Sequence, residues 1–323
     1  MTASNLRVSF EQHQVAIYFG AVIVAVAAAM TAPGLGTLEP AMSPALAVML
    51  FATFLQVPLA DLGTAFREFR FMAALLVANF IAIPVAVALL VQFLPPDPLL
   101  RVGVLIVLLT PCIDYVVTFS HLGQADARAL LAATPLLLGV QMLLLPIYLG
   151  FLLGEAGRGL IQIEPFVHAF IWLIVVPLFL AGVVQVWARK RSTGAGVRNA
   201  LGLLPVPATA VVLFVVVCSV VPQLDAARAS AIQVVPIYVA FAALAPFVGL
   251  AVGRLFRLPA AGSRAVAFSA ATRNSLVVLP LGLAVPGAVP VLPAIIVTQT
   301  LVELLSELVY VRFMPKMGKE VEG

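Results

Sequence analysis

Apolar residues gather along the chain in runs that short polar breaks separate. The runs are about twenty residues long, which at a helical rise of about 1.5 Å per residue crosses a hydrocarbon core of about 30 Å. Strands of a membrane β-barrel would instead give alternating segments of about ten residues. The pattern therefore predicts an all-α polytopic membrane protein.

The breaks delimit ten predicted transmembrane helices, whose boundaries are uncertain by a few residues. Their ranges are 15–31, 43–58, 71–94, 101–122, 129–153, 166–187, 203–222, 233–253, 264–286 and 290–312. Ten helices divide into two sets of five, and an odd number per repeat turns the second copy upside down. We predict a first five-helix repeat over 1–154 and a second, inverted repeat over 155–323.

A weak internal similarity agrees with this division. The run PLLLGVQ begins at Pro135 and ends at Gln141, and the run PAIIVTQ begins at Pro293 and ends at Gln299. Both pairs are 158 residues apart. Applied one helix earlier, the same offset aligns the polar interruption of the fourth helix with that of the ninth.

Composition and charge set the environment and the orientation. Hydrophobic residues make up 63% of the 323 residues and charged residues 10%, against about a quarter in a soluble domain. With the N-terminus in the cytoplasm, 14 of the 18 Lys and Arg residues fall in cytoplasmic segments and 3 in external ones. The positive-inside rule thus predicts both termini in the cytoplasm of a multi-pass plasma-membrane protein. The polar N-terminus lacks the pattern of a cleaved signal, and Cys112 and Cys218 lie in separate apolar runs, so we expect neither processing nor a disulfide.

Two of the predicted helices carry polar interruptions. Leu109 to Asp126 reads LTPCIDYVVTFSHLGQAD, and Pro111 removes a backbone donor and crowds the preceding turn, so the fourth helix should break near 110–114. The stretch ATRNSLVVLP (271–280) predicts a second break that ends at Pro280. Broken helices at matched positions of inverted halves mark the binding site of a transporter. The chain is therefore interpreted as a carrier and not an enzyme.

The most deeply placed charges are Asp114 and Arg273, and each alone would be unfavourable near the bilayer centre. We expect them to pair where the broken helices cross. Two interpretations are open: the pair lines the substrate or coupling-ion site, or it is a structural bridge. The predicted substrate-binding residues are Cys112, Asp114, Thr272, Arg273, Asn274 and Ser275.

Further polar residues are candidates for coupling or gating. They are Asp114, His121, Gln141, Gln299 and Glu303. His121 is expected at the cytoplasmic end of the fourth helix, and the amides can equally serve as interhelical hydrogen-bonding groups. Glu307, one turn after Glu303, is expected to reach the cytoplasmic interface.

Several motifs are missing from the sequence. It has no Walker sequence, no GxGxxG after a strand and no His/Cys cluster with metal-ligand spacing. We expect no cofactor, no bound metal and no nucleic-acid partner. The expected partners are the lipid bilayer and a small inorganic or organic anion or oxyacid, and the oligomeric state is open.

At Pro111 and Cys112, followed by Val116, Ser120, Leu122 and Asp126, the sequence resembles the arsenite-efflux (arsenical resistance) family of the bile acid:sodium symporter superfamily. The ten-helix, two-by-five pattern extends the resemblance over nearly the whole chain. It implies a core domain with two crossing broken helices and a panel domain, each drawn from both repeats, and alternating access. It also implies export of arsenite or antimonite, with an essential role for Cys112.

The ninth helix departs from that family. The family pattern alanine–serine–asparagine–asparagine–phenylalanine–glutamate is matched here by residues 271–276, ATRNSL, so the acid is absent and Arg273 is present. The sodium-coupled branch has a glutamine where Arg273 stands and a glutamate near Ser269. Our hypothesis is that Arg273 takes the place of a bound sodium ion, so that transport is proton-linked or uncoupled.

Three functions are weighed. The leading hypothesis is a secondary transporter that exports arsenite or antimonite. The alternative is a carrier of a small organic anion with Arg273 as the anion clamp. A channel or scaffold is the third, and the charges placed within the breaks argue against it.

Overall fold

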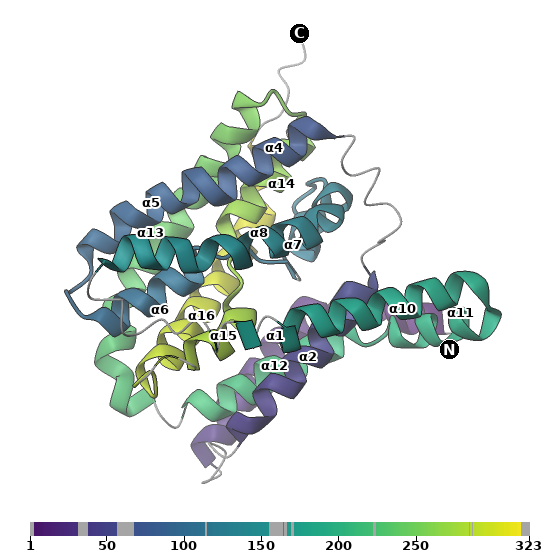
Figure 1. The fold of residues 1–323 in the computed structure, drawn as a ribbon, viewed down its shortest axis with the longest axis horizontal. Coiled ribbons are helices and arrows are strands. Elements are labelled where there is room, and N and C mark those ends of the chain that lie inside the picture. The colour runs from purple at the N-terminus through teal and green to yellow at the C-terminus, as the bar shows by residue number, and fades with distance from the viewer. Residues whose placement is uncertain are drawn as a thin grey trace. The chain divides into compact units, whose positions relative to one another are not determined.

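The computed structural model describes residues 3–31, 38–56, 68–113, 115–154, 164, 167–168, 171–221, 224–283, 285 and 287–317. The regular elements of this part of the chain are helices (Figure 1). In chain order they are α1 (Ala3–Thr31), α2 (Glu39–Gln56), α4 (Phe69–Val77), η2 (Ala78–Ala82), α5 (Ile83–Leu90), η3 (Val91–Phe93), α6 (Pro98–Leu108), α7 (Val116–Leu122), α8 (Ala127–Leu153), η5 (Ile171–Val175), α10 (Val176–Lys190), α11 (Ser192–Leu201), α12 (Pro205–Val220), α13 (Leu224–Leu255), α14 (Ala260–Ala271), α15 (Ser275–Leu283), α16 (Val291–Phe313) and η7 (Met314–Lys316).

The chain forms two compact units, and each unit is built from two separate segments. The first unit comprises Met1–Leu59 and Ile163–Ala227, and the second comprises Ala60–Gln162 and Arg228–Gly323. The first unit thus contains α1, α2, η5, α10, α11 and α12. The second contains α4 to α8, nearly all of α13, and α14 to α16.

In the first unit, α12 packs against α1 and α2, and α10 packs against α2 and α11. Buried polar groups between these helices are satisfied by backbone carbonyls. The side-chain amide of Gln185 donates to the carbonyl of Phe54 at 3.1 Å, and the thiol of Cys218 donates to that of Ala25 at 3.5 Å. Hydrogen bonds of this kind between neighbouring helices satisfy polar side chains that are buried among apolar ones.

In the second unit, α6 packs against α16 and α8, while α14 packs against α4, α7 and α8. Helix α13 approaches α14 closely at two glycines one turn apart. A Cβ at Gly249 would lie 2.5 Å from the Cα of Ala267, and one at Gly253 would lie 2.8 Å from the Cα of Ser263. Small residues at this spacing let membrane helices pack backbone to backbone.

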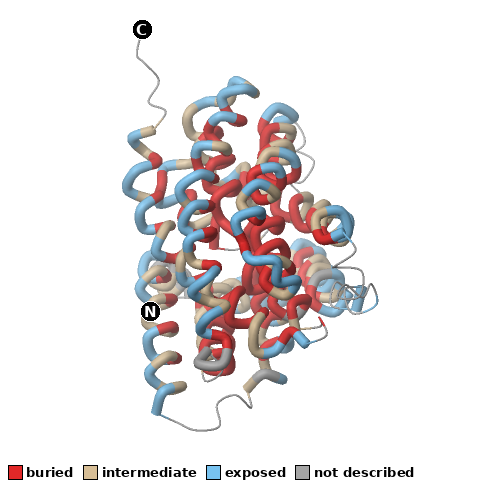
Figure 2. Tube along the Cα trace, turned by 90° about the vertical axis from the view of Figure 1, so that its left-hand side faces the viewer, coloured by how far each residue is buried: buried red, intermediate tan, exposed pale blue. Residues whose placement is uncertain are grey.

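Within the described residues, seven helices are long and apolar enough to cross a membrane. Three of the ten predicted spans are therefore not among them: α2, which is shorter, and the interrupted pairs α6/α7 and α14/α15. Buried and exposed residues alternate along the long helices (Figure 2), and the exposed ones include many large apolar side chains. The protein is an all-helical, multi-pass membrane protein, and the ten-span inverted repeat stays a prediction.

Both predicted helix interruptions occur, but the second one does not lie at Pro280. Helix α6 ends at Leu108 and α7 begins at Val116, with Pro111 between them. Helix α14 ends at Ala271, and α15 begins at Ser275 and continues past Pro280 to Leu283. The expected break at Pro280 is wrong, and the interruption is Thr272–Asn274. Membrane helices tolerate interior prolines, and α8 and α13 each contain two.

Candidate functional site

The two interrupted helices meet backbone to backbone at their breaks. Pro111 and Arg273 form an isolated antiparallel bridge. The N–H of Cys112 donates to the carbonyl of Thr272 at 3.0 Å, and the N–H of Asn274 donates to the carbonyl of Thr110 at 2.9 Å. Each break thus supplies partners for backbone groups that the other break leaves without a helical partner, as irregular backbone at membrane depth requires.

The guanidinium of Arg273 is fully buried and is surrounded by oxygen atoms. Its Nη2 donates to the carbonyl of Ser269 at 2.5 Å and to that of Ala270 at 2.7 Å, and Nη1 donates to the carbonyl of Leu108 at 3.4 Å. These carbonyls lie at the C-terminal ends of α14 and α6, where the helix dipole concentrates negative partial charge. Arg273 is therefore a built-in cation that stabilises the ends of both half-helices.

Asn79 and Phe241 complete the surroundings of this cation. Asn79 lies in the π-helical turn η2, where its Oδ1 accepts from Nη2 of Arg273 at 2.9 Å. Its Nδ2 donates to the hydroxyl of Ser269 at 2.9 Å. The ring centroid of Phe241 lies 5.6 Å from the guanidinium carbon, within the range of cation–π attraction. The sequence does not single out Asn79 as a site residue, because a π turn changes the helix face and leaves no pattern in the residues.

Glu303 of α16 faces the same break from the other side. Its carboxylate accepts from the backbone N–H of Arg273 at 2.6 Å, from the amide of Gln299 at 2.5 Å, and from the hydroxyl of Tyr115. The amide oxygen of Gln299 in turn accepts from the hydroxyl of Ser275. A buried, hydrogen-bonded chain therefore runs from the start of α7 through Glu303 to the start of α15.

Glu307, one turn further along α16, is fully buried, so the expectation that it reaches an interface is wrong. Its Oε1 lies 2.5 Å from the hydroxyl of Thr272. Among the described residues no partner is found for its Oε2, nor for Nε of Arg273 or Nδ2 of Asn274. The region around the breaks thus holds buried polar atoms with unused hydrogen-bonding capacity, which is uncommon away from functional sites.

Most predicted site residues gather here. Cys112, Thr272, Arg273, Asn274 and Ser275 are all buried at or beside the breaks. The backbone N–H of Cys112 bonds to Thr272, the residue before Arg273. The predicted coupling residues Gln299 and Glu303 are joined to this group by hydrogen bonds.

Three other predicted residues have different outcomes. Asp114 lies outside the described residues, so its pairing with Arg273 stays a prediction. His121 is exposed in the last turn of α7. Gln141 is buried in α8, and its side-chain amide has no hydrogen-bond partner among the described residues. The geometry does not join either of these two to the breaks.

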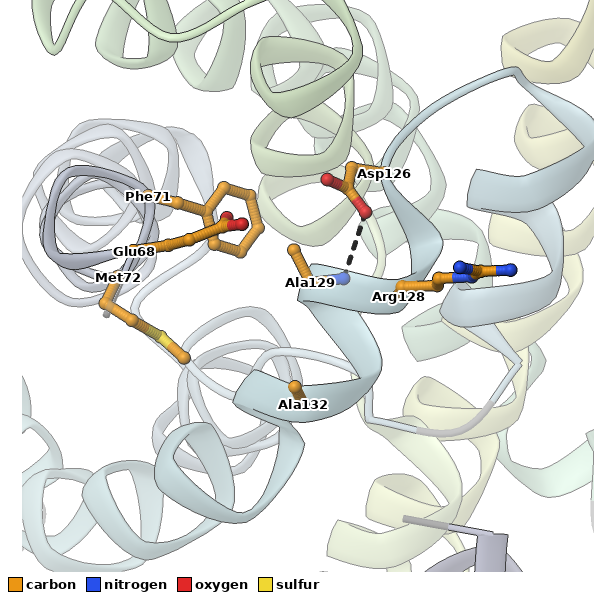
Figure 3. Close-up of a pocket in the computed structure, with 7 residues that line it drawn as sticks. All are labelled: Glu68, Phe71, Met72, Asp126, Arg128, Ala129 and Ala132. Atoms are coloured by element: carbon orange, nitrogen blue, oxygen red, sulfur yellow. Dashed lines mark hydrogen bonds between the residues drawn. The ribbon is translucent and has the colours of Figure 1, made fainter. Parts of the chain in front are cut away.

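A separate pocket of about 310 Å³ lies between the start of α4 and the start of α8 (Figure 3). Glu68, Phe71 and Met72 line it from one side, and Asp126 caps α8 on the other by accepting from the N–H of Ala129 at 3.0 Å. The side chain of Arg128 points away from Glu68 in this view. Asp126 therefore has a local structural role as a helix cap.

The helical fold and the crossing breaks define a membrane carrier built on interrupted helices. The profile described as the Sodium Bile acid symporter family matches residues 43–230, more than half of the chain, and the chain belongs to this family. It is accordingly a multi-pass membrane transporter, and the bilayer is its environment. A search of curated proteins finds no match. The family match ends before α14, so the roles of Arg273, Glu303 and Glu307 rest on the sequence and the structure of this chain.

Proposed function

We propose that this protein is a secondary transporter that exports arsenite and antimonite across the cytoplasmic membrane by alternating access. In this proposal both termini are cytoplasmic and the chain consists of two inverted five-helix repeats, 1–154 and 155–323. The repeated order of half-helix pair and long helix, α6–α7–α8 and α14–α15–α16, supports this organisation.

The observation that carries the proposal is the position of Cys112. Its backbone N–H bonds directly to the second break, at the residue before Arg273. Thiolates are soft ligands that suit trivalent arsenic. In the reversible step, the sulfur of Cys112 displaces one hydroxyl group from arsenous acid, and the thiol proton leaves with that hydroxyl as water.

Unpartnered donors beside Cys112 support an oxyacid substrate. Nε of Arg273 and Nδ2 of Asn274 are buried donors for which the described residues offer no acceptor. The remaining oxygen atoms of the bound oxyacid can accept these hydrogen bonds. Because Cys112 is fully buried, the substrate reaches it only when the breaks open. Alternating access supplies that opening.

The surroundings of Arg273 support transport that is proton-linked or uncoupled. Sodium binds to oxygen ligands such as backbone carbonyls, and the carbonyls at the ends of α6 and α14 already accept hydrogen bonds from the guanidinium. A sodium ion in this position would be repelled by a fixed positive charge a few ångströms away.

A carrier of small organic anions is the second candidate. The unpartnered Nε of Arg273 and Nδ2 of Asn274 favour it equally, since a carboxylate would accept from both. The Nη atoms count against a clamp, because they are already occupied by carbonyl oxygens and by Asn79.

Arsenite accumulation in inside-out vesicles energised with a proton gradient tests the proposal. We expect accumulation in the wild type, its loss in Cys112→Ser, and its retention in the matched control Cys218→Ser, whose thiol lies in α12. Vesicles that hold folded wild-type protein but take up arsenite no faster than protein-free vesicles, with or without the proton gradient, would contradict arsenite export. Uptake of small carboxylates that persists in Cys112→Ser would then favour the organic-anion carrier.

A further inference from the structure

Two buried carboxyl groups lie one helical turn apart on α16. Glu303 is 3% exposed and Glu307 is fully buried. Among the described residues, Arg273 is the one other buried side chain that carries a formal charge. If both carboxyl groups were ionised, the described part of the cluster would hold two negative charges and one positive charge. An excess buried charge costs several kcal/mol, so one carboxyl group is expected to keep a proton.

The hydrogen bonds indicate that Glu303 is the ionised member. It accepts from the backbone N–H of Arg273, the amide of Gln299 and the hydroxyl of Tyr115, which are three donors from three segments of the chain. An ionised carboxylate is acceptor-only, and donors of this number stabilise its charge.

Glu307 has a different environment. Its contact is with the hydroxyl oxygen of Thr272, which lies 2.5 Å from Oε1 and also 2.7 Å from the carbonyl oxygen of Phe268. Each of these short oxygen–oxygen contacts needs a hydrogen atom between the two oxygens. A hydroxyl carries one hydrogen, and a carbonyl carries none. Thr272 can direct its one hydrogen to either Glu307 or Phe268, and when it donates to Phe268 a protonated Glu307 supplies the hydrogen of the other contact.

We propose that Glu307 and Thr272 form the proton-binding site through which a proton gradient acts on the transporter. This inference rests on the proposed function for its coupling role. The neutral Glu307 carboxyl donates to Thr272, and the backbone carbonyl of Thr272 accepts from Cys112 at 3.0 Å. One residue thus contacts both the proton site and the residue proposed to bind substrate. Opening the break separates Thr272 from Glu307 and releases the proton.

The neighbouring groups define how the site titrates. Among the described residues, Glu303 and Tyr310 on α16 act directly on Glu307, and Arg273 in the second break and Tyr115 before α7 act on Glu303. Tyr310 donates to the carbonyl of Ala242 on α13 at 2.6 Å. Arg101 on α6 donates instead to the carbonyls of Pro95 and Leu94. Once Glu307 loses its proton, Glu303 is a negative charge one helical turn away, and repulsion between the two favours rebinding.

Infrared spectroscopy of the purified protein tests the site without transport. A protonated carboxyl group gives a C=O stretching band that shifts in deuterated water. We expect this band in the wild type, its loss in Glu307→Gln, and its retention in the matched control Cys218→Ser, whose side chain lies in α12. A band that persists in Glu307→Gln, or a wild type without the band, would overturn the proposal.

A second variant keeps Glu307 in place. Thr272→Val is nearly isosteric and removes the oxygen that accepts from Glu307, so the carboxyl band should move to the higher frequency of a free C=O group. An unmoved band would contradict the assigned hydrogen bond. This arm is informative even where replacement of Glu307 prevents folding.

Transport separates this inference from the proposed function. In vesicles, Glu307→Gln should still move arsenite down its own gradient, and its ratio of rates with and without a proton gradient should fall to one. If the proton gradient accelerates arsenite transport equally in the wild type and in Glu307→Gln, Glu307 is not the proton site. Arsenite export would still stand in that case. A wild type that does not respond to the gradient would contradict the coupling role, whereas the infrared band would still decide where the proton resides.

Discussion

Nη2 of Arg273 donates a 2.9 Å hydrogen bond to Oδ1 of Asn79, a residue 194 positions earlier in the chain. The bond joins the π-helical turn that follows α4 to the break between α14 and α15. The amide nitrogen of the same side chain, Nδ2, donates to the hydroxyl of Ser269. The buried cation is therefore held by side-chain geometry as well as by carbonyls at helix ends.

Asn79→Ala should destabilise the protein by about 1–3 kcal/mol, since it leaves one donor of a buried guanidinium without this acceptor. The midpoint of thermal unfolding in detergent measures the effect. Asn274→Ala is the matched control, because the amide nitrogen of Asn274 has no hydrogen-bond partner among the described residues. Equal loss of stability in both variants would contradict the role assigned to Asn79.

Arg273→Gln should make the protein respond to sodium. The substitution removes the fixed positive charge and leaves the carbonyls of Leu108, Ser269 and Ala270 and the amide oxygen of Asn79 without their donor. Oxygen atoms so arranged suit a hard cation. We expect sodium chloride, but not choline chloride, to raise the thermal midpoint of the variant and to leave the wild type unchanged. A variant indifferent to sodium would show that the oxygen atoms do not form a cation site.

Gly249→Ala should destabilise the second unit by about 1–3 kcal/mol, because the new methyl group would overlap the backbone of α14 at Ala267. Gly139→Ala in α8 is the control, since nothing lies within 4 Å of a Cβ there. Alanine favours a helix interior by about 0.5–1 kcal/mol over glycine, so the control should be neutral or stabilised. The midpoints of thermal unfolding of the two variants measure the effect. A Gly249→Ala variant as stable as the wild type would contradict the close packing of α13 on α14.

The sequence allowed the helical class and the two interruptions to be predicted, because both depend on local chemistry. Hydrophobic run length marks membrane helices, and the polar cluster Thr272–Ser275 marks the second break better than Pro280 does. A proline at membrane depth is an ambiguous signal. Pro111 lies in a break, whereas Pro280 lies within α15, and neighbouring helices decide between these outcomes.

The partners of the buried polar groups could not be predicted in the same way. Glu307 was expected at an interface because of its distance along α16, yet it is buried against Thr272. Tyr115 and Asn79 contact the site from segments far away in the sequence, and no local pattern encodes such contacts. Sequence identifies which residues carry chemistry, whereas the packing of distant helices determines what they bond to.

The central claim is that the guanidinium of Arg273 stands where a coupling cation would bind. The most direct test is the arsenite transport rate of the purified wild type in liposomes, measured with a sodium gradient and with sodium fully replaced by choline. We expect equal rates under the two conditions. A rate that requires sodium while Arg273 is intact would contradict it.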